Sequence, residues 1–205
     1  MGQKKLEILH NASMIFMRYG IKSVTMDDVA RELGVSKKTI YLYFKDKNDL
    51  VTEIIKAKTQ EDKSECVDVK SDSENAIAEM FAISKMVIAK ISSMNPSVFY
   101  DLQKYHPKAW QLMNEHRWEF VYKSFLDNVN RGIEEGIYRN DINPEIVARM
   151  NVSMADMIFN GTTFPLEQFK YDTVFEEIFR FQIHGMANEK GLNYLLSNYN
   201  KIKNA

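Results

Sequence analysis

The chain has 205 residues, of which 45% are hydrophobic and 27% are charged, an ordinary globular composition that excludes a disordered chain or a collagen-like fibre. Its apolar runs are only a few residues long, which is too short for a transmembrane helix, and the first twenty residues lack the continuous apolar core of a signal peptide. We therefore expect a cytoplasmic protein of one large domain or two small ones.

The charge is unevenly distributed, although the net charge is only −1. Residues 1–50 carry nine lysines and arginines against six acidic residues, a balance of +3, which leaves 18 against 22, or −4, for residues 51–205. A basic N-terminal quarter on an acidic body suggests an anionic partner for the N-terminus.

Glycine and proline are scarce, and the apolar residues between them recur at helical rather than strand spacing. This pattern predicts an all-α fold. We expect the polar stretch 59–73 to fray or to end a helix. In chain order, the predicted helices cover residues 4–19, 26–33, 37–44, 47 to at least 57, 74–94, 96–105, 107–135, 144–160, 173–187 and 192–199.

Residues 25–44 have the pattern of a helix-turn-helix. Thr25, with Asp28 three positions later, predicts a capped first helix. Gly34 suits the turn because glycine adopts a positive φ angle at little cost. Ser36 is placed to cap the second helix, whose N-terminal turn would lie nearest the base edges in a DNA major groove.

The second helix has an exposed face with DNA-binding chemistry. Hydroxyl groups and lysines suit phosphates and base edges, and aromatic rings suit thymine methyl groups and sugars. Ile40 and Phe44, which are four residues apart, are assigned to the core instead. Lys47 falls in the first turn of the next helix, where its ammonium group and free backbone amides would hold one phosphate.

The segment from Ile8 to Leu50 resembles the DNA-binding domain of the TetR family of bacterial transcription regulators. The string GVSKKTIYLYFKDKNDL, residues 34–50, is particularly specific. This sequence departs from the usual pattern at Lys38, where many members have glycine, and at Tyr43, where many have histidine. The residues that match are Ile8, Leu9, Ala12, Phe16, Gly20, Thr25, Val29, Ala30, Leu33, Gly34, Val35, Ser36, Thr39, Ile40, Tyr41, Phe44, Lys47 and Leu50.

The resemblance implies nine or ten helices in two domains. Residues 1–50 would bind DNA through a three-helix domain, with a linking helix from about residue 47, and residues 51–205 would form a larger ligand-binding and dimerisation domain. The resemblance also implies a homodimeric repressor that a ligand releases from a palindromic operator. It places DNA contacts at Thr25, Ser36, Lys37, Thr39, Tyr41, Tyr43 and Lys47, to which the chemistry of the side chains adds Lys38.

The predicted body is rich in methionine and aromatic residues. Such residues at helical spacing form a helical core in most proteins, but they also suit an adaptable apolar pocket for a small, largely apolar effector. The candidate pocket residues are Phe99, Tyr100, Trp110, Met113 and Met154.

The helices predicted at about 144–160 and 173–187 are apolar on more than one face. One face can pack against the rest of the chain and another against a second copy of it, so we expect a homodimer through these helices. No cofactor is expected, and no metal, because His116 and Glu119 share a helix face without a third ligand fixed by local spacing. Two alternatives remain: an enzyme that uses the apolar body, although no catalytic constellation supports it, and a protein-interaction module whose helix-turn-helix does not read DNA.

Overall fold

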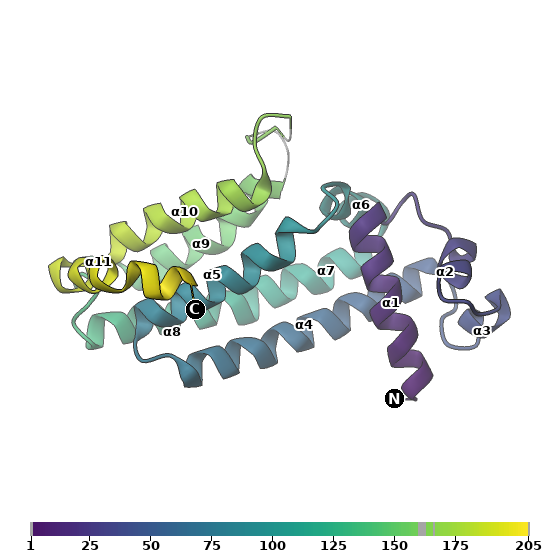
Figure 1. Cartoon of the computed structure of the whole chain (residues 1–205), viewed down its shortest axis with the longest axis horizontal. Helices are drawn as coiled ribbons and strands as arrows, with labels where there is room; N and C mark the ends of the chain where they lie inside the picture. Colours follow the sequence, from purple (N-terminus) through teal and green to yellow (C-terminus); the bar gives the residue numbers. More distant parts are fainter. Residues whose placement is uncertain (1, 160–162, 166, 205) are drawn as a thin grey trace. The chain divides into compact units, whose positions relative to one another are not determined.

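The computed structural model of the chain, drawn in Figure 1, describes residues 2–159, 163–165 and 167–204. These residues form an all-α fold, as predicted, with no β-strand and one isolated bridge between Tyr138 and Ala187. The elements are α1 (Gln3–Tyr19), α2 (Met26–Glu32), α3 (Lys37–Tyr41), α4 (Lys47–Asp72), α5 (Ala76–Ser92), α6 (Ser97–Tyr105), α7 (Pro107–His116), a π-helical segment η1 (Arg117–Val121), α8 (Tyr122–Glu134), α9 (Pro144–Phe159), α10 (Tyr171–Met186) and α11 (Glu189–Asn204).

The helices agree with the prediction in number and differ in some of their bounds; α3, for example, ends at Tyr41 and not at residue 44. The segments α7, η1 and α8 follow one another without a break, so the helix predicted over 107–135 exists but contains a π-helical turn. Counted as one, they bring the described chain to ten helices. The last helix is longer than the predicted 192–199. The predicted end of the 144–160 helix at Asn160 lies outside the described residues.

The expectation that the helix from residue 47 frays or ends in the polar stretch 59–73 is wrong. Helix α4 has 26 residues and continues to Asp72. Ion pairs between neighbouring turns accompany it, among them Lys58 with Glu61 at 2.7 Å. Such pairs stabilise an exposed helix without an apolar stripe, which is why apolar periodicity did not reveal this half of α4.

Residues 1–62 and 93–116 form one compact unit, here called unit 1. It contains α1, α2 and α3, the first part of α4, and α6 with α7. Within it, α2 and α3 pack side by side (Figure 1). Its buried apolar residues include Ile8 and Phe16 of α1, Val29 of α2, Ile40 of α3 and Leu50 of α4.

Residues 63–92 and 117–205 form a second compact unit, unit 2. Here α5 packs against α8, α10 and α11, and α9 packs against α8 and α10 (Figure 1). The core of this unit includes Ile77, Val129, Ala148, Phe179 and Ile183.

Two further findings concern the described residues as a whole. None of their helices is both long and apolar enough to cross a membrane. They also contain no group of three or more histidine, cysteine or acidic side chains with the geometry of a metal site. The division into residues 1–50 for DNA binding and 51–205 for ligand binding and dimerisation stays a prediction.

Candidate nucleic-acid interface

The start of α2 is fixed by a reciprocal cap between Thr25 and Asp28. The Thr25 hydroxyl accepts the Asp28 backbone N–H at 3.1 Å, while the Asp28 carboxylate accepts the Thr25 backbone N–H at 2.9 Å. The Thr25 hydroxyl also donates to this carboxylate, and these hydrogen bonds from Thr25 hold the pKa of Asp28 below its ordinary value. Because the cap occupies the hydroxyl proton, a phosphate at Thr25 is held through the N-terminal amides of α2, unless it takes this proton from Asp28.

The turn between α2 and α3 depends on Gly34. Its φ angle is +63°, in the left-handed region, and no described atom lies within 4 Å of the position that a Cβ would take. Glycine is therefore required here for its backbone conformation and not for space. The next residue, Val35, donates its N–H to the Ala30 carbonyl at 3.0 Å, which closes the turn.

Helix α3 presents its predicted DNA-binding residues outward because its apolar side is buried. Ile40 and Phe44 are buried, as predicted, at 0% and 1% exposure. Tyr41 and Tyr43 are exposed, with 44% and 37% of their surface open. Leu42, which the sequence analysis did not single out, is 72% exposed between them. An apolar side chain at this place suits a sugar or a thymine methyl group.

The first turn of α3 carries two hydroxyls and two lysines. The Ser36 hydroxyl accepts the Thr39 backbone N–H at 3.1 Å and so caps the helix. Lys37 forms an ion pair with Asp27 of α2 at 2.6 Å, and this hydrogen bond raises the pKa of Lys37. Lys38 is exposed and takes part in no ion pair among the described residues. The cationic charge needed for phosphates is thus already at the surface.

Lys47 is the first residue of α4 and is only half-buried. Its ammonium nitrogen lies 3.4 Å from the Lys22 carbonyl oxygen and 5.8 Å from the centre of the Phe16 ring. Burial lowers the pKa of Lys47, while the carboxylates of Asp101 and Asp28 oppose this effect. The lysine is therefore held at the junction of α1, α2 and α4 and does not extend freely into solvent.

Comparison with known proteins agrees with this geometry. Residues 8–54 match the family model described as bacterial regulatory proteins of the tetR family. YhgD of Bacillus subtilis, an uncharacterized HTH-type transcriptional regulator, is 31% identical over 146 residues, which are 69% of this chain and 73% of the relative. The chain belongs to the TetR family.

Two further comparisons extend over most of the chain. The transcriptional repressor KstR2 of Mycobacterium tuberculosis is 22% identical over 155 residues, 72% of the TetR-family chain described here and 76% of the relative. A putative transcriptional regulator from Saccharomonospora viridis, crystallised with choline, has the same fold, with a TM-score of 0.72 at 17% identity over 92% of this chain and 100% of its own. The matched proteins are transcription regulators and not enzymes. The chain is accordingly a DNA-binding transcription regulator.

The ligand pocket predicted for this TetR-family chain stays a prediction. Phe99 and Tyr100 lie on α6 and Trp110 and Met113 on α7, all in unit 1, whereas Met154 lies on α9 in unit 2. The first four are thus brought onto two consecutive helices. Tyr100 is 53% exposed, and its hydroxyl oxygen accepts a hydrogen bond from Lys104 at 2.6 Å, so it lies on a wet surface of the unit.

Two hollows in the described part of the TetR-family chain are lined by other residues. One, of about 520 Å³, lies in unit 2 beside Ile133, Tyr138 and Asn188. The other, of about 450 Å³, lies in unit 1 between Tyr19 of α1 and Asp28 of α2. Both are open surface hollows of mixed polarity, which is not the enclosed apolar site that a largely apolar effector needs.

Lys22 and Asp101 of the TetR-family chain were not predicted from the sequence. The Asp101 carboxylate, on α6, accepts the Lys22 backbone N–H at 2.8 Å, and the Lys22 carbonyl in turn faces Lys47. The two residues are 79 positions apart. No local sequence motif predicts such a contact, because only the fold brings the two residues together.

Proposed function

We propose that the chain is a homodimeric repressor that acts in the cytoplasm, binds a palindromic operator and is released by a small, largely apolar ligand. The observation that carries the proposal is the first turn of α3. There Ser36, Lys37 and Lys38 are exposed and Thr39 is half-buried, on a helix anchored by the buried Ile40. A short helix with this arrangement reads base edges from its N-terminal residues when it lies in the major groove.

Residues around α3 supply the phosphate contacts that set its register. Thr25 at the start of α2 and Lys47 at the start of α4 each combine a polar side chain with the unpaired amides of a helix N-terminus. Tyr41 and Tyr43 extend the contact surface along α3. We therefore propose Thr25, Ser36, Lys37, Lys38, Thr39, Tyr41, Tyr43 and Lys47 as the DNA-binding set.

The dimer would form through α9 and α10. On α9, Ile146 and Met150 are 57% and 51% exposed and lie four residues apart on one face. On α10, Phe181 is 76% exposed, and a Cβ built at Gly185, one turn further along, would have no described atom within 4 Å apart from its chain neighbours and the backbone of its own helix. A glycine inside a helix costs about 0.5–1 kcal/mol relative to alanine, and this one lets a second helix approach closely.

Release by a small molecule is supported by the composition of α6 and α7 and by the choline complex of the Saccharomonospora viridis regulator. In this chain the predicted pocket residues Phe99, Tyr100, Trp110, Met113 and Met154 would provide the apolar contacts. An effector that binds the DNA-free conformation more tightly lowers operator affinity by the ratio of its two affinities.

The test is in-vitro selection of the purified protein on a pool of randomised DNA duplexes at moderate salt. Enrichment of one palindromic site, with half-sites separated by about one helical turn (roughly 34 Å) or a small multiple of it, supports a sequence-reading dimer. Selection is repeated after extraction of bound small molecules, because a co-purified effector would suppress binding. Absence of any enriched site from both preparations contradicts the proposal.

A further inference from the structure

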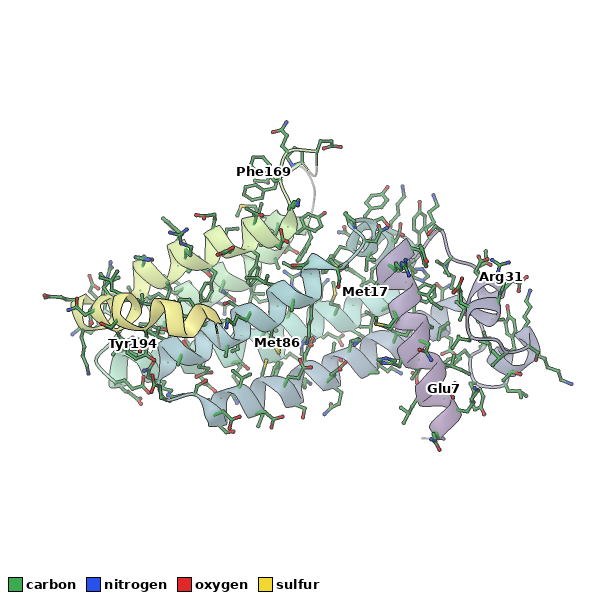
Figure 2. The ribbon with its side chains drawn as sticks, viewed as in Figure 1. Glu7, Met17, Arg31, Met86, Phe169 and Tyr194 are labelled. Atoms are coloured by element: carbon green, nitrogen blue, oxygen red, sulfur yellow. The ribbon has the colours of Figure 1, made fainter. Side chains whose placement is uncertain are left out.

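Residues of α6 and of the α5–α6 connection form hydrogen bonds with the end of α1 and with the turn between α1 and α2. The backbone N–H of Asn95 donates to the Met17 carbonyl at 2.6 Å, and its side-chain amide donates to the Arg18 carbonyl at 3.4 Å. Met17, labelled in Figure 2, lies near the C-terminal end of α1. Asn95 therefore satisfies carbonyls that the end of α1 leaves unpaired.

Gly20, at the start of this turn, lies directly against α6. A Cβ built on Gly20 would be 2.5 Å from the Ser97 hydroxyl oxygen and 3.5 Å from a carboxylate oxygen of Asp101. Its φ angle of +85° also favours glycine. The backbone of the turn is thus pressed against the first turn of α6 with no side chain between them.

Asp101 is a buried carboxylate, with 4% of its surface exposed. It accepts the Lys22 backbone N–H at 2.8 Å and the Ser97 hydroxyl at 3.3 Å. A buried carboxylate is costly unless hydrogen bonds or a counter-charge compensate it. These hydrogen bonds therefore fix the Asp101 side chain in one orientation, toward the α1–α2 turn. Most acidic residues on a short amphipathic helix face solvent instead.

Lys22 connects this carboxylate to Lys47. The backbone N–H of Lys22 points to Asp101, and its carbonyl oxygen lies 3.4 Å from the Lys47 ammonium group. The Phe16 ring lies 5.8 Å from the same ammonium group. Loss of the Asp101 hydrogen bond frees the turn, and Lys47 then loses the carbonyl that orients it.

We propose that Asp101 is a positioning residue for DNA binding: it fixes the α1–α2 turn through the Lys22 N–H, and the turn holds Lys47 where it meets a DNA phosphate. This rests on the proposed function, which gives Lys47 its phosphate. Asp101 itself does not touch DNA. It lies on α6, the helix that also carries Phe99 and Tyr100 of the predicted ligand pocket.

The test measures binding of the full-length protein to a labelled mixed-sequence duplex over a series of salt concentrations. The variants are Asp101→Ala, Asp101→Asn, Lys47→Ala and the double variant Asp101→Ala/Lys47→Ala. Asp101→Ala is expected to weaken binding by about tenfold at low salt and to reduce the slope of log affinity against log salt by about 0.9, one phosphate's share. Lys47→Ala should give the same change in slope.

The double variant separates positioning from general damage to the fold. If Asp101 acts through Lys47, adding Asp101→Ala to Lys47→Ala has no further effect on affinity or slope. Asp101→Asn keeps an oxygen that accepts the Lys22 N–H, so it should bind within about twofold of the wild type. Gln103→Ala, an exposed residue of the same helix, is the matched control and should bind like the wild type.

The remaining outcomes each decide a question. Additive losses in the double variant, or an unchanged salt slope in Asp101→Ala, overturn the positioning role while the proposed function stands. A wild-type protein that binds no duplex at low salt overturns both. If thermal unfolding shows that Asp101→Ala does not fold, Asp101→Ser replaces it, because a buried serine can satisfy its hydroxyl on its own helix backbone and is too short to reach Lys22.

Discussion

The hydroxyl groups of Ser36 and Thr39 lie 2.8 Å apart at the start of α3, and the Ser36 oxygen also accepts the Thr39 backbone N–H. One of the two hydroxyls donates to the other, so the pair keeps one O–H free. The same two side chains therefore cap the recognition helix and offer a donor to DNA, and substitutions can separate these two roles.

Substitutions at Ser36 should affect stability and DNA binding differently. Ser36→Ala removes the cap and should lower the free energy of unfolding by about 1 kcal/mol. Ser36→Asp keeps a capping oxygen and should leave stability within roughly 0.5 kcal/mol of the wild type, but its negative charge faces the phosphates. Urea unfolding and duplex binding measure the two effects. The interpretation is wrong if Ser36→Asp binds DNA better than Ser36→Ala.

The ion pair between Lys37 and Asp27 should compete with DNA. Both side chains are more than half exposed, so solvent screens the pair and DNA can break it easily. Asp27→Asn frees Lys37 and removes a negative charge, and should therefore raise duplex affinity by up to roughly fivefold. Glu32→Gln, an exposed acidic residue of the same helix, is the control for charge alone. Equal gains in the two variants would show that the pairing itself is unimportant.

The local features of this interface were predictable because each is written in a few neighbouring residues. Thr25 with Asp28, Gly34 and Ser36 specify caps and a turn by chemistry that acts within four positions. The contact of Asp101 with Lys22 spans 79 positions and is created only by packing of α6 on the α1–α2 turn. Residues proposed to contact DNA are therefore easier to predict from sequence than residues proposed to position them.

The long helix α4 and the π-helical turn show a second limit. Apolar periodicity ends where α4 becomes polar, yet the backbone continues as a helix through Asp72. In η1, Arg117 donates to the Val152 carbonyl at 2.9 Å and pairs with Asp156 at 2.8 Å, both on α9. The π-helical turn thus lies against a helix that is distant in sequence, and no spacing rule within residues 107–135 predicts it.

Arg131 should be a strong determinant of the stability of unit 2. Its guanidinium group pairs with the carboxylate of Glu79, 2% exposed, at 3.1 Å and with Glu135 at 2.7 Å. Arg131→Met leaves the buried Glu79 without its partner and should lower the free energy of unfolding by about 3 kcal/mol. Arg139→Met breaks an exposed pair with Asp141 and should cost less than about 1 kcal/mol. Chemical unfolding compares the two, and similar losses would contradict the argument.

His106 should make the protein less stable as the solution is acidified. It is 6% exposed, and its Nδ1 atom has no hydrogen-bond partner among the described residues. Burial lowers the pKa of His106, and the charge of Lys47 lowers it further, against the weaker effect of Asp101. The unfolded chain then binds a proton that the folded chain does not, so stability falls as the pH drops through the unfolded-state pKa of about 6.5.

The His106 prediction is tested by the difference in unfolding free energy between about pH 7.5 and about pH 5.5, on either side of that unfolded-state pKa. His106→Gln should lose less stability on acidification than the wild type, because its side chain does not titrate. His10→Gln alters an exposed histidine on α1 and should follow the wild-type curve. An unchanged pH dependence in His106→Gln would mean that other groups cause the acid sensitivity.

Phe181 should hold the dimer together, because a side chain that is 76% exposed on α10 buries little apolar surface within its own chain. Phe181→Arg places a charge at a contact that would otherwise bury apolar surface, and is expected to shift the protein from dimer to monomer in analytical ultracentrifugation. Leu196→Arg changes an equally exposed residue, 78% open on α11, outside the proposed interface. This variant should remain dimeric.

The Phe181→Arg variant should also lose operator affinity, because it no longer dimerises. A monomer binds only one half-site at a time and loses the gain from simultaneous binding by two linked DNA-binding domains. A dimeric Phe181→Arg protein, or dissociation caused equally by Leu196→Arg, would place the interface elsewhere.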